Sequence, residues 1–213
     1  FNRLNKINRE VIALWSGVLR AVPGSRLQMA GMPANGAPEE LLQWFAAEGI
    51  AEDRLIFYPR SGFSEYLKLH NQVDFCLDTF PYTGGTTTLH ALWMGVPTLT
   101  IGGHAYPSYQ GALMLHQVGL EDYFVANNKE DFIIKALFLV KNQIFLQDAR
   151  FKLRNYLVDG YSASLKAVVD SFSLAFQMTW QGWCEGEKPR SIRIDNSDIN
   201  FDPCFVNYSD VIQ

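Results

Sequence analysis

The residues from Asp78 to Thr88 have the composition of a phosphate-binding loop. They read DTFPYTGGTTT and lie between an apolar stretch of strand length and an expected helix. Gly84 and Gly85 carry no Cβ, so the backbone there can approach a phosphate closely. The hydroxyls of Thr86 and Thr87 can donate hydrogen bonds to the same group. Because a helix N-terminus offers unpaired amides and a partial positive charge to an anion, this segment predicts a diphosphate site.

The same residues also have a simpler interpretation. Two glycines can form a turn, and a threonine can cap the following helix, without any ligand. Neither G-x-G-x-x-G after a strand nor G-x-x-x-x-G-K-[ST] occurs, which disfavours a dinucleotide dehydrogenase or a P-loop enzyme. G-x-S-x-G is also missing, so the sequence gives no support to a hydrolase with a catalytic triad.

Strands and helices alternate around this loop. From Asn8, an expected N-cap, apolar residues recur at helical spacing until Pro23 ends the helix. Further strands are expected at 26–31, 54–58, 73–78, 97–101 and 123–126, and further helices at 38–49, 64–69 (with Ser64 as the cap), 86–94, 108–118, 129–142, 144–158 and 163–183. This alternation predicts an α/β fold with a Rossmann-like parallel sheet flanked by helices.

The composition predicts a globular domain that does not bind nucleic acid. The chain has 213 residues, 48% of them hydrophobic, and a net charge of −4 without a face dense in Lys and Arg. Cys76, Cys184 and Cys204 are dispersed, so we expect neither a zinc site nor a disulfide framework, and a reducing compartment. No apolar run approaches the roughly 20 residues of a membrane span, and a signal-peptide pattern is missing. We therefore expect a cytoplasmic protein that makes no membrane contact.

Several motifs, in the correct order, resemble one family. The stretch DTFPYTGGTTTLHALWMGVPTLTIGG is similar to the nucleotide-binding segment of the O-linked N-acetylglucosamine transferase and SPINDLY family, particularly its bacterial members. Residues 1–7 resemble the family element F-N-x-x-x-K-I. Residues 54–57, 66 and 73–74 resemble the intervening strand, helix and strand, and residues 176–186 resemble the final helix. The resemblance covers residues 1 to about 190.

The resemblance implies the carboxyl-terminal catalytic lobe of a two-lobed GT-B glycosyltransferase. Residues 1–160 would form the nucleotide-sugar-binding lobe, 161–186 a C-terminal crossover helix and 187–213 an extended polar tail. A start at Phe1 rather than Met suggests a piece of a longer protein. The implied partners are a nucleotide-sugar donor, a protein acceptor, and an N-terminal catalytic lobe and helical repeats of the parent chain. Without that other lobe, we expect Trp180 and Trp183 to be exposed.

The resemblance also assigns the residues that would hold the diphosphate. Lys6 matches the family lysine that contacts this group, and we expect Lys6 to be catalytic because an ammonium can balance the charge of the leaving group. Gly85, Thr86 and Thr87 match the family loop at the diphosphate, and Gly84 precedes them. Arg3 lies where the animal enzymes carry a glutamine near the diphosphate.

Three further residues are expected to bind the nucleoside. Tyr66 lies where the animal enzymes place a histidine that stacks near the uracil. Ser61 belongs to a turn whose family counterpart contacts the base through its backbone. His90 matches an acidic family residue that touches the ribose, and it follows Thr86 by one helical turn on the same face. A histidine that only packs between helices is the alternative for His90.

The implied function is an inverting, metal-independent transfer of a sugar, expected to be N-acetylglucosamine, from a UDP-sugar to Ser or Thr hydroxyls of proteins. No cofactor is expected, because D-x-D is missing and the spacing of His70, His104 and His116 does not suggest a metal site. A non-catalytic sugar-nucleotide sensor or scaffold is the alternative, because His90 and Tyr109 depart from the family pattern. An epimerase or phosphorylase with the same half-fold is a third hypothesis, without a supporting signature. The sequence leaves open which sugar and which nucleoside are bound.

Overall fold

The computed structural model describes residues 1–188 and 190–192, with side chains other than those of residues 161–164. The chain divides into two compact units, Phe1–Leu157 and a second unit that begins at Val158. The tail predicted for 187–213 lies almost entirely outside the described residues.

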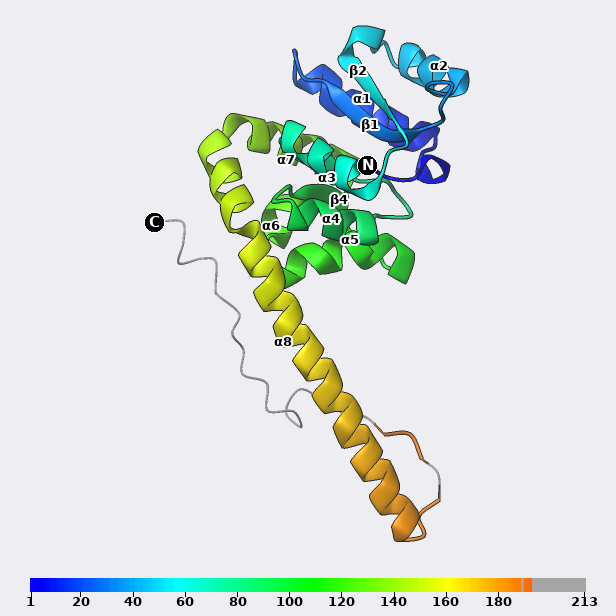
Figure 1. Cartoon of the computed structure of the whole chain (residues 1–213), viewed down its shortest axis with the longest axis vertical. Helices are drawn as coiled ribbons and strands as arrows, with labels where there is room; N and C mark the ends of the chain where they lie inside the picture. The colour runs from blue at the N-terminus through cyan, green and yellow to red at the C-terminus, as the bar shows by residue number, and fades with distance from the viewer. Residues whose placement is uncertain (189, 193–213) are drawn as a thin grey trace. The chain divides into compact units, whose positions relative to one another are not determined.

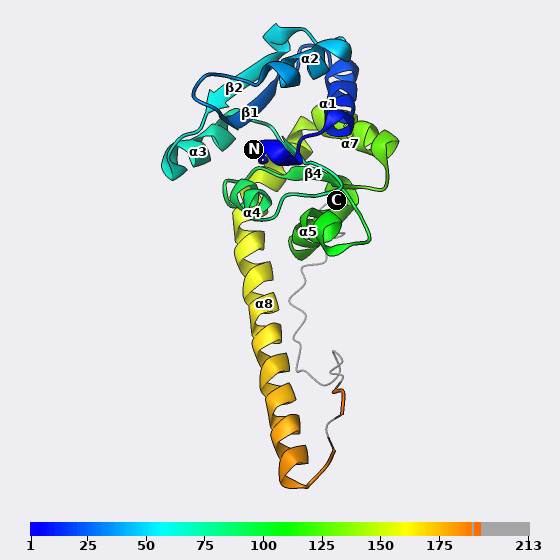
Figure 2. The same ribbon diagram turned by 90° about the vertical axis from the view of Figure 1, so that its right-hand side faces the viewer.

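The first unit alternates strands with helices, as the sequence predicts (Figures 1 and 2). Its elements in chain order are η1 (Leu4–Lys6), α1 (Arg9–Ala21), β1 (Leu27–Met32), α2 (Glu39–Ala47), η2 (Glu52–Arg54), β2 (Leu55–Pro59), α3 (Phe63–Leu69), η3 (His70–Gln72), β3 (Cys76–Leu77), α4 (Thr86–Trp93), β4 (Thr98–Ile101), α5 (Tyr106–Gln117), α6 (Glu121–Phe124), β5 (Val125–Ala126) and α7 (Lys129–Lys141). The last helix, α8 (Gln143–Cys184), begins in this unit.

All strand pairs among the described residues are parallel, and they form two groups. One group has the order β1-β2, with Leu27 opposite Leu55, and the other has the order β3-β4-β5, with Cys76 opposite Thr98 and Thr100 opposite Val125. In both views β1 and β2 lie with α1 and α2, whereas β4 lies with α4 and α5. The expected α/β fold with parallel strands is therefore confirmed, and its strands are divided between two sheets.

Helix α1 contributes to the core on both sides. The predicted N-cap is confirmed, because the Asn8 side chain accepts a hydrogen bond of 2.9 Å from the amide of Val11. One stripe of α1, including Ile12 and Trp15, packs in the cluster that contains β1 and α2. A second stripe, Leu14 and Val18, packs in the cluster that contains Leu99 of β4 and Phe132 of α7. This single amphipathic helix thus has a buried stripe in each of the two core clusters.

Some predicted boundaries are wrong. The strand expected over 73–78 pairs only at Cys76–Leu77, and residues 121–124 form helix α6 before the two-residue strand β5. Ser64 does not cap α3, which begins at Phe63 after Gly62 without a side-chain cap.

The two helices predicted at 144–158 and 163–183 are one continuous helix, α8. Gly160 costs a helix only about 1 kcal/mol relative to alanine, and residues 157–164 contain no proline to end it. The helix expected over 161–186 is therefore the later part of α8.

In the second unit, the later part of α8 carries exposed apolar side chains. They recur at helical spacing and include Leu165, Val168, Val169, Phe172, Phe176, Trp180 and Trp183. Trp180 is 68% exposed and Trp183 is 75% exposed, as the sequence predicts for a chain without the other lobe. Across the part of the chain that the structure describes, no helix combines the length and apolarity needed to cross a bilayer.

Candidate functional site

Buried Asp78 organises the loop that follows β3. Its Oδ1 accepts hydrogen bonds from the backbone amides of Thr79 and Gly84, both at 2.8 Å, and from Asn2 Nδ2 at 3.2 Å. Its Oδ2 accepts a hydrogen bond of 2.8 Å from the hydroxyl of Thr100 in β4. Burial raises the pKa of this carboxyl, and the hydrogen bonds oppose that rise. The loop is therefore held in place by one side chain that directly follows β3.

Close packing inside the loop requires Gly84. A Cβ on Gly84 would lie 2.3 Å from Thr88 Oγ1, 3.0 Å from Thr87 Oγ1 and 3.2 Å from Asp78 Oδ1. Gly111 of α5 is restricted from the other side, because its Cβ would lie 2.8 Å from Asp78 Oδ2. The packing of the turn thus requires a glycine at position 84, whether or not a phosphate approaches the backbone there.

The N-terminus of α4 follows this turn. Gly85 is its N-cap residue and supplies no side-chain hydrogen bond. The first amides of an α-helix have no partner within the helix, so those at the start of α4 can bind an anion. The side chain of Thr86 is exposed, that of Thr87 is half-buried and that of Thr88 is buried. The first two hydroxyls can therefore reach a ligand beside these amides.

The opening residues of the chain contact the loop directly. Lys6 Nζ donates a hydrogen bond of 2.8 Å to the carbonyl of Thr83 and lies 3.9 Å from the ring centroid of Tyr82. The Asn2 side chain, which donates to Asp78, also accepts a hydrogen bond of 3.3 Å from the Thr87 hydroxyl. Burial lowers the pKa of Lys6, the charge of Asp78 opposes this effect, and the charge of Arg3 adds to it. The Lys6 ammonium thus contacts Thr83, which lies three residues before the start of α4.

An aromatic cluster borders the loop on the side of α3. The ring centroids of Tyr66 and His90 are 5.6 Å apart, those of Tyr66 and His70 are 5.1 Å apart, and Phe1 stacks on His70 at 4.2 Å. Within the described residues, Tyr66 Oη, His70 Nε2 and His90 Nδ1 are buried without a hydrogen-bond partner. Burial raises the pKa of Tyr66 to about 12 and lowers that of His70 to about 4. Both groups are therefore neutral near pH 7.

The predicted site residues occupy different parts of this arrangement. Lys6 lies against the loop that carries Gly84, Gly85, Thr86 and Thr87, and Tyr66 and His90 lie together in the aromatic cluster. Arg3 is exposed, and its charge acts on Lys6. Ser61 is exposed in the turn between β2 and α3, so the structure does not bring its side chain into the network around Asp78 or into the aromatic cluster.

Sequence reasoning missed the residues that join these parts. Asp78, Asn2 and His70 were not among the predicted site residues, and neither was Trp15, whose Nε1 donates a hydrogen bond of 3.0 Å to the Asp78 carbonyl. An acidic residue at the end of an apolar strand is a signal that could have identified Asp78. In the ranges 1–188 and 190–192, no group of three or more His, Cys, Asp or Glu side chains is arranged to hold a metal ion.

Comparisons with known proteins find one family. The family Glycosyl transferase family 41 matches residues 1–167. The chain is 30% identical over 210 residues to a rice protein (Oryza sativa subsp. japonica) named as a probable UDP-N-acetylglucosamine–peptide N-acetylglucosaminyltransferase SPINDLY, covering 97% of the chain and 22% of that protein. It is 27% identical over 201 residues to a protein of the same named activity, SEC, from Arabidopsis thaliana, covering 94% of the chain and 20% of that protein.

A solved structure is also similar. It is a lysine-to-methionine mutant of the O-GlcNAc transferase of Thermobaculum terrenum, with a TM-score of 0.75 and 30% identity. The match covers 87% of this chain and 36% of that one. The chain spans about a fifth of the length of the curated plant relatives.

Proposed function

Because the chain belongs to glycosyl transferase family 41, we propose that it is the donor-binding lobe of an inverting, metal-independent glycosyltransferase of the GT-B fold. The relatives are named as UDP-N-acetylglucosamine–peptide N-acetylglucosaminyltransferases, so the proposed donor is UDP-N-acetylglucosamine and the proposed acceptor is a Ser or Thr hydroxyl of a protein. The observation that carries the proposal is the 2.8 Å hydrogen bond between Lys6 Nζ and Thr83, which holds an ammonium beside the start of α4.

Three kinds of donor bind the diphosphate in this proposal. The amides at the start of α4 and the hydroxyl of Thr86 bind its oxygens. The Thr87 hydroxyl binds a diphosphate oxygen by exchanging its hydrogen bond to Asn2 for one to the ligand. Lys6 contributes the positive charge, since an ammonium has three donors and the Thr83 carbonyl takes one of them. Arg3, which is exposed near Lys6, adds to the positive potential. This set of donors replaces a divalent ion.

In the transfer step, negative charge develops on the diphosphate oxygen that leaves the sugar, and the amides, hydroxyls and ammonium described above lie around the diphosphate. The acceptor oxygen attacks the anomeric carbon, the bond from that carbon to the diphosphate oxygen breaks, and its electron pair leaves with UDP. Donors that are already positioned stabilise this charge without reorganising, which is how an oxyanion-type site lowers a barrier. The acceptor proton passes to a base that the family resemblance places on the other lobe. The isolated chain is therefore expected to bind nucleotide and to catalyse little transfer.

The aromatic cluster binds the nucleoside in this proposal. Tyr66 offers a ring for stacking on the base, and His90 Nδ1, which is buried without a partner, accepts or donates a hydrogen bond to a ribose hydroxyl. The exposed turn around Ser61 supplies backbone contacts to the base edge. A cytoplasmic location and a bacterial origin are further parts of the proposal, and they rest on the dispersed cysteines and on the motif resemblance respectively.

Calorimetric titration of the chain with UDP tests the site. We expect micromolar-to-millimolar affinity that falls about tenfold, or about 1.4 kcal/mol, in Lys6→Ala and in Thr87→Val. Lys141→Ala removes an exposed lysine at the end of α7 and serves as the charge-matched control with unchanged affinity. GDP in place of UDP identifies the preferred nucleoside. Equal UDP affinity in wild type and both site variants would contradict the assignment.

Sugar transfer by the full-length parent protein tests the reaction. We expect transfer of N-acetylglucosamine to a protein acceptor, lost in the parent that carries Lys6→Ala. A parent that binds UDP-sugar but transfers nothing would instead be a sugar-nucleotide sensor or scaffold, for which the departures at His90 and Tyr109 are the structural basis.

A further inference from the structure

The ring of Tyr82 lies over the ammonium of Lys6. The distance from Lys6 Nζ to the ring centroid is 3.9 Å, and the same nitrogen donates a hydrogen bond of 2.8 Å to the carbonyl of Thr83. A cation over the face of an aromatic ring, within about 6 Å of its centroid, is attracted by the ring electrons. The face of the ring makes this contact, so it does not require the hydroxyl of Tyr82. Two consecutive residues of the loop thus contact this ammonium, one through a ring and one through a carbonyl.

The backbone of these two residues is fixed by hydrogen bonds. The hydroxyl of buried Thr79 donates a hydrogen bond of 2.7 Å to the carbonyl of Tyr82. The amide of Thr83 donates one of 2.9 Å to the carbonyl of Pro107 in α5, and the Thr83 hydroxyl accepts one of 3.2 Å from the amide of Gly111. The ring and the carbonyl that contact the ammonium are therefore carried by a part of the loop that is attached to α5.

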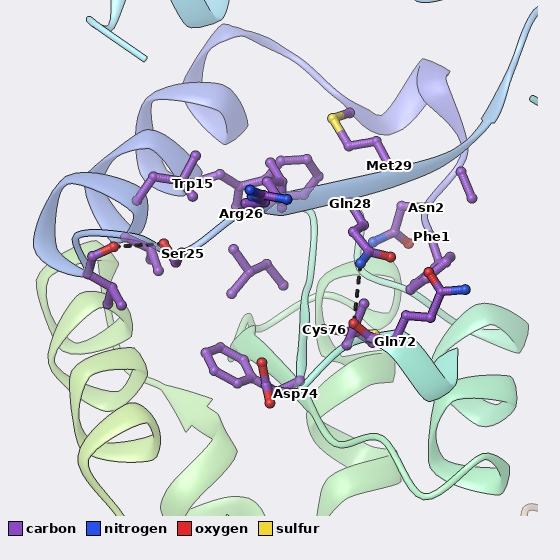
Figure 3. Close-up of a pocket in the computed structure, with 18 of the residues that line it drawn as sticks. Phe1, Asn2, Trp15, Ser25, Arg26, Gln28, Met29, Gln72, Asp74 and Cys76 are labelled. Carbon is purple, nitrogen blue, oxygen red and sulfur yellow. Dashed lines mark hydrogen bonds between the residues drawn. The ribbon is translucent and has the colours of Figure 1, made fainter. Parts of the chain in front are cut away.

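Lys6 faces the loop and not the cavity beside the opening residues. Phe1 and Asn2 line a cavity of about 310 Å³ together with residues of β1 and β3 (Figure 3), whereas Lys6 and Tyr82 are not among its lining residues. Lys6 ends the short 3-10 helix η1, and its ammonium bonds to Thr83. The position of the ammonium is therefore set by the loop, through Tyr82 and Thr83.

These two contacts leave part of the ammonium free for a ligand. A lysine ammonium has three N–H groups. The Thr83 carbonyl takes one of them, and the Tyr82 ring attracts the nitrogen from a second direction, so the directions that remain for a ligand are limited. An unrestrained lysine side chain loses much of its rotamer freedom when a ligand immobilises it. Contacts that are formed before binding remove part of that cost.

An aromatic ring supports the charge of Lys6 without adding a negative charge to the site. Burial lowers the pKa of Lys6, the charge of Asp78 raises it, and the charge of Arg3 lowers it further. The attraction of a ring favours the ammonium over the neutral amine, so it opposes the effect of burial. A carboxylate in the place of the ring would also favour the ammonium, but its negative charge would repel a diphosphate. The Tyr82 ring therefore suits a site that must stay positive.

We propose that Tyr82 is a positioning residue for the transfer reaction, because its ring and the Thr83 carbonyl direct the Lys6 ammonium toward the diphosphate. This inference rests on the proposed function, in which Lys6 binds the leaving group. It adds a residue that contributes to donor binding through Lys6 and needs no contact of its own with the donor. A phenylalanine at position 82 retains the face of the ring, whereas a leucine is apolar but lacks it.

An NMR titration of Lys6 without ligand tests the contact itself. In protein labelled with ¹³C-lysine, the Cε signal of Lys6 is assigned by its absence in Lys6→Arg. We expect the pKa of Lys6 to fall in Tyr82→Leu, because the ammonium loses the ring, and to keep its wild-type value in Tyr82→Phe. Fluorinated phenylalanines at position 82 keep the size of the ring and weaken its attraction for a cation, so the pKa of Lys6 should fall with each added fluorine.

Calorimetric titration with UDP tests the effect of the ring on donor binding. We expect UDP affinity to fall about threefold to fivefold in Tyr82→Leu and to change less than about twofold in Tyr82→Phe. In the Lys6→Ala background, Tyr82→Leu should cause no further loss, because the ring acts only through the ammonium. Tyr106→Leu is the matched control with unchanged affinity, since it removes a tyrosine of α5 that is 74% exposed and lies apart from the described contacts of Lys6.

Each of three results would overturn the proposal. An unchanged pKa of Lys6 in Tyr82→Leu would mean that the ring does not stabilise the ammonium. The same loss of UDP affinity from Tyr82→Leu with and without Lys6 would mean that Tyr82 contacts the donor directly. A wild type that does not bind UDP would overturn the proposed function, and with it the role of Tyr82 in donor binding. The ligand-free titration distinguishes that last result from a failure of the contact between the ring and the ammonium.

Discussion

The two halves of the candidate site, the loop around Asp78 and the aromatic cluster, differ in whether their buried polar atoms have hydrogen-bond partners. Around Asp78, both carboxylate oxygens accept hydrogen bonds, from Asn2, Thr79, Gly84 and Thr100. In the aromatic cluster, three buried polar atoms, on Tyr66, His70 and His90, have no partner within the described part of the chain. The Asp78 carboxylate is therefore fully hydrogen-bonded without a ligand, whereas the three atoms of the aromatic cluster gain hydrogen bonds only when a ligand supplies them.

This difference matters because an unpartnered buried polar group costs roughly 1–3 kcal/mol. A ligand that offers a hydroxyl or an amide to Tyr66 Oη or His90 Nδ1 relieves that cost, and a nucleoside carries such groups. A site that must stabilise a leaving group instead benefits from dipoles fixed in advance. The contrast therefore matches the two roles proposed for the site, with the diphosphate at the loop and the nucleoside at the cluster.

The largest expected effect comes from removing the centre of the loop network. Asp78→Ala leaves the buried amides of Thr79 and Gly84 without their acceptor, so the free energy of unfolding should fall by about 3 kcal/mol. Urea denaturation measures this loss. Asp74→Ala, which removes an exposed carboxylate four residues earlier, should change stability by no more than about 0.5 kcal/mol. Equal effects of the two variants would mean that the loop does not depend on Asp78.

Gly84→Ala tests how tightly the loop is packed. Its Cβ would lie 2.3 Å from Thr88 Oγ1, so we expect a loss of about 2 kcal/mol in unfolding free energy together with weaker UDP binding. Gly62→Ala is the matched control for stability, because nothing lies within 4 Å of its Cβ position and its φ is −63°. If Gly84→Ala proved as stable as Gly62→Ala, the loop would have to be more open than the short distances around Gly84 imply.

His70 should make the aromatic cluster sensitive to acid. Burial lowers the pKa of His70 in the folded chain to about 4 from the ordinary 6.5. Between pH 6.5 and pH 4, this histidine is therefore protonated in the unfolded chain and neutral in the folded chain. Its contribution to stability is therefore present above pH 6.5 and is lost as the pH falls toward 4, by about 2 kcal/mol at pH 5.

Thermal unfolding at pH 7 and pH 5 checks this prediction. Wild type and the control His104→Leu, which changes an exposed histidine, should lose stability alike, and His70→Leu should lose about 2 kcal/mol less. The same loss in all three proteins would rule out His70 as the cause.

The smallest expected effect is the pH dependence of UDP binding at Lys6. Because burial lowers the pKa of Lys6 below 10.5, its ammonium loses a proton at a lower pH than an ordinary lysine. UDP affinity should therefore fall several-fold as the pH rises from neutral to about 10. Lys6→Arg keeps its charge in this range and should show a flatter profile in calorimetric titrations. Parallel profiles for wild type and Lys6→Arg would show that the ammonium of Lys6 does not bind the diphosphate.

Much of the fold was predictable because its signals are local. The Asn8 cap, the apolar stripes of α1 and the start of α4 after two glycines each depend on fewer than about ten neighbouring residues. Failures occurred where the local signal was ambiguous. A break was expected between residues 158 and 163, but α8 continues through it. The strand expected at 123–126 is too short for its apolar residues to distinguish a strand from a helix, and only Val125 and Ala126 form one.

The sequence by itself determined the order of strands and helices, and the resemblance of the loop and of Lys6 to a known family. Only the tertiary structure decided that Asn2 bridges Asp78 and Thr87, that His70 is buried against Phe1, and that the Tyr82 ring lies over the Lys6 ammonium. The physical reason is distance along the chain. A period or a cap is set by a residue's neighbours, whereas a hydrogen bond between residues 2 and 78 exists only when the intervening strands have brought their ends to the same edge.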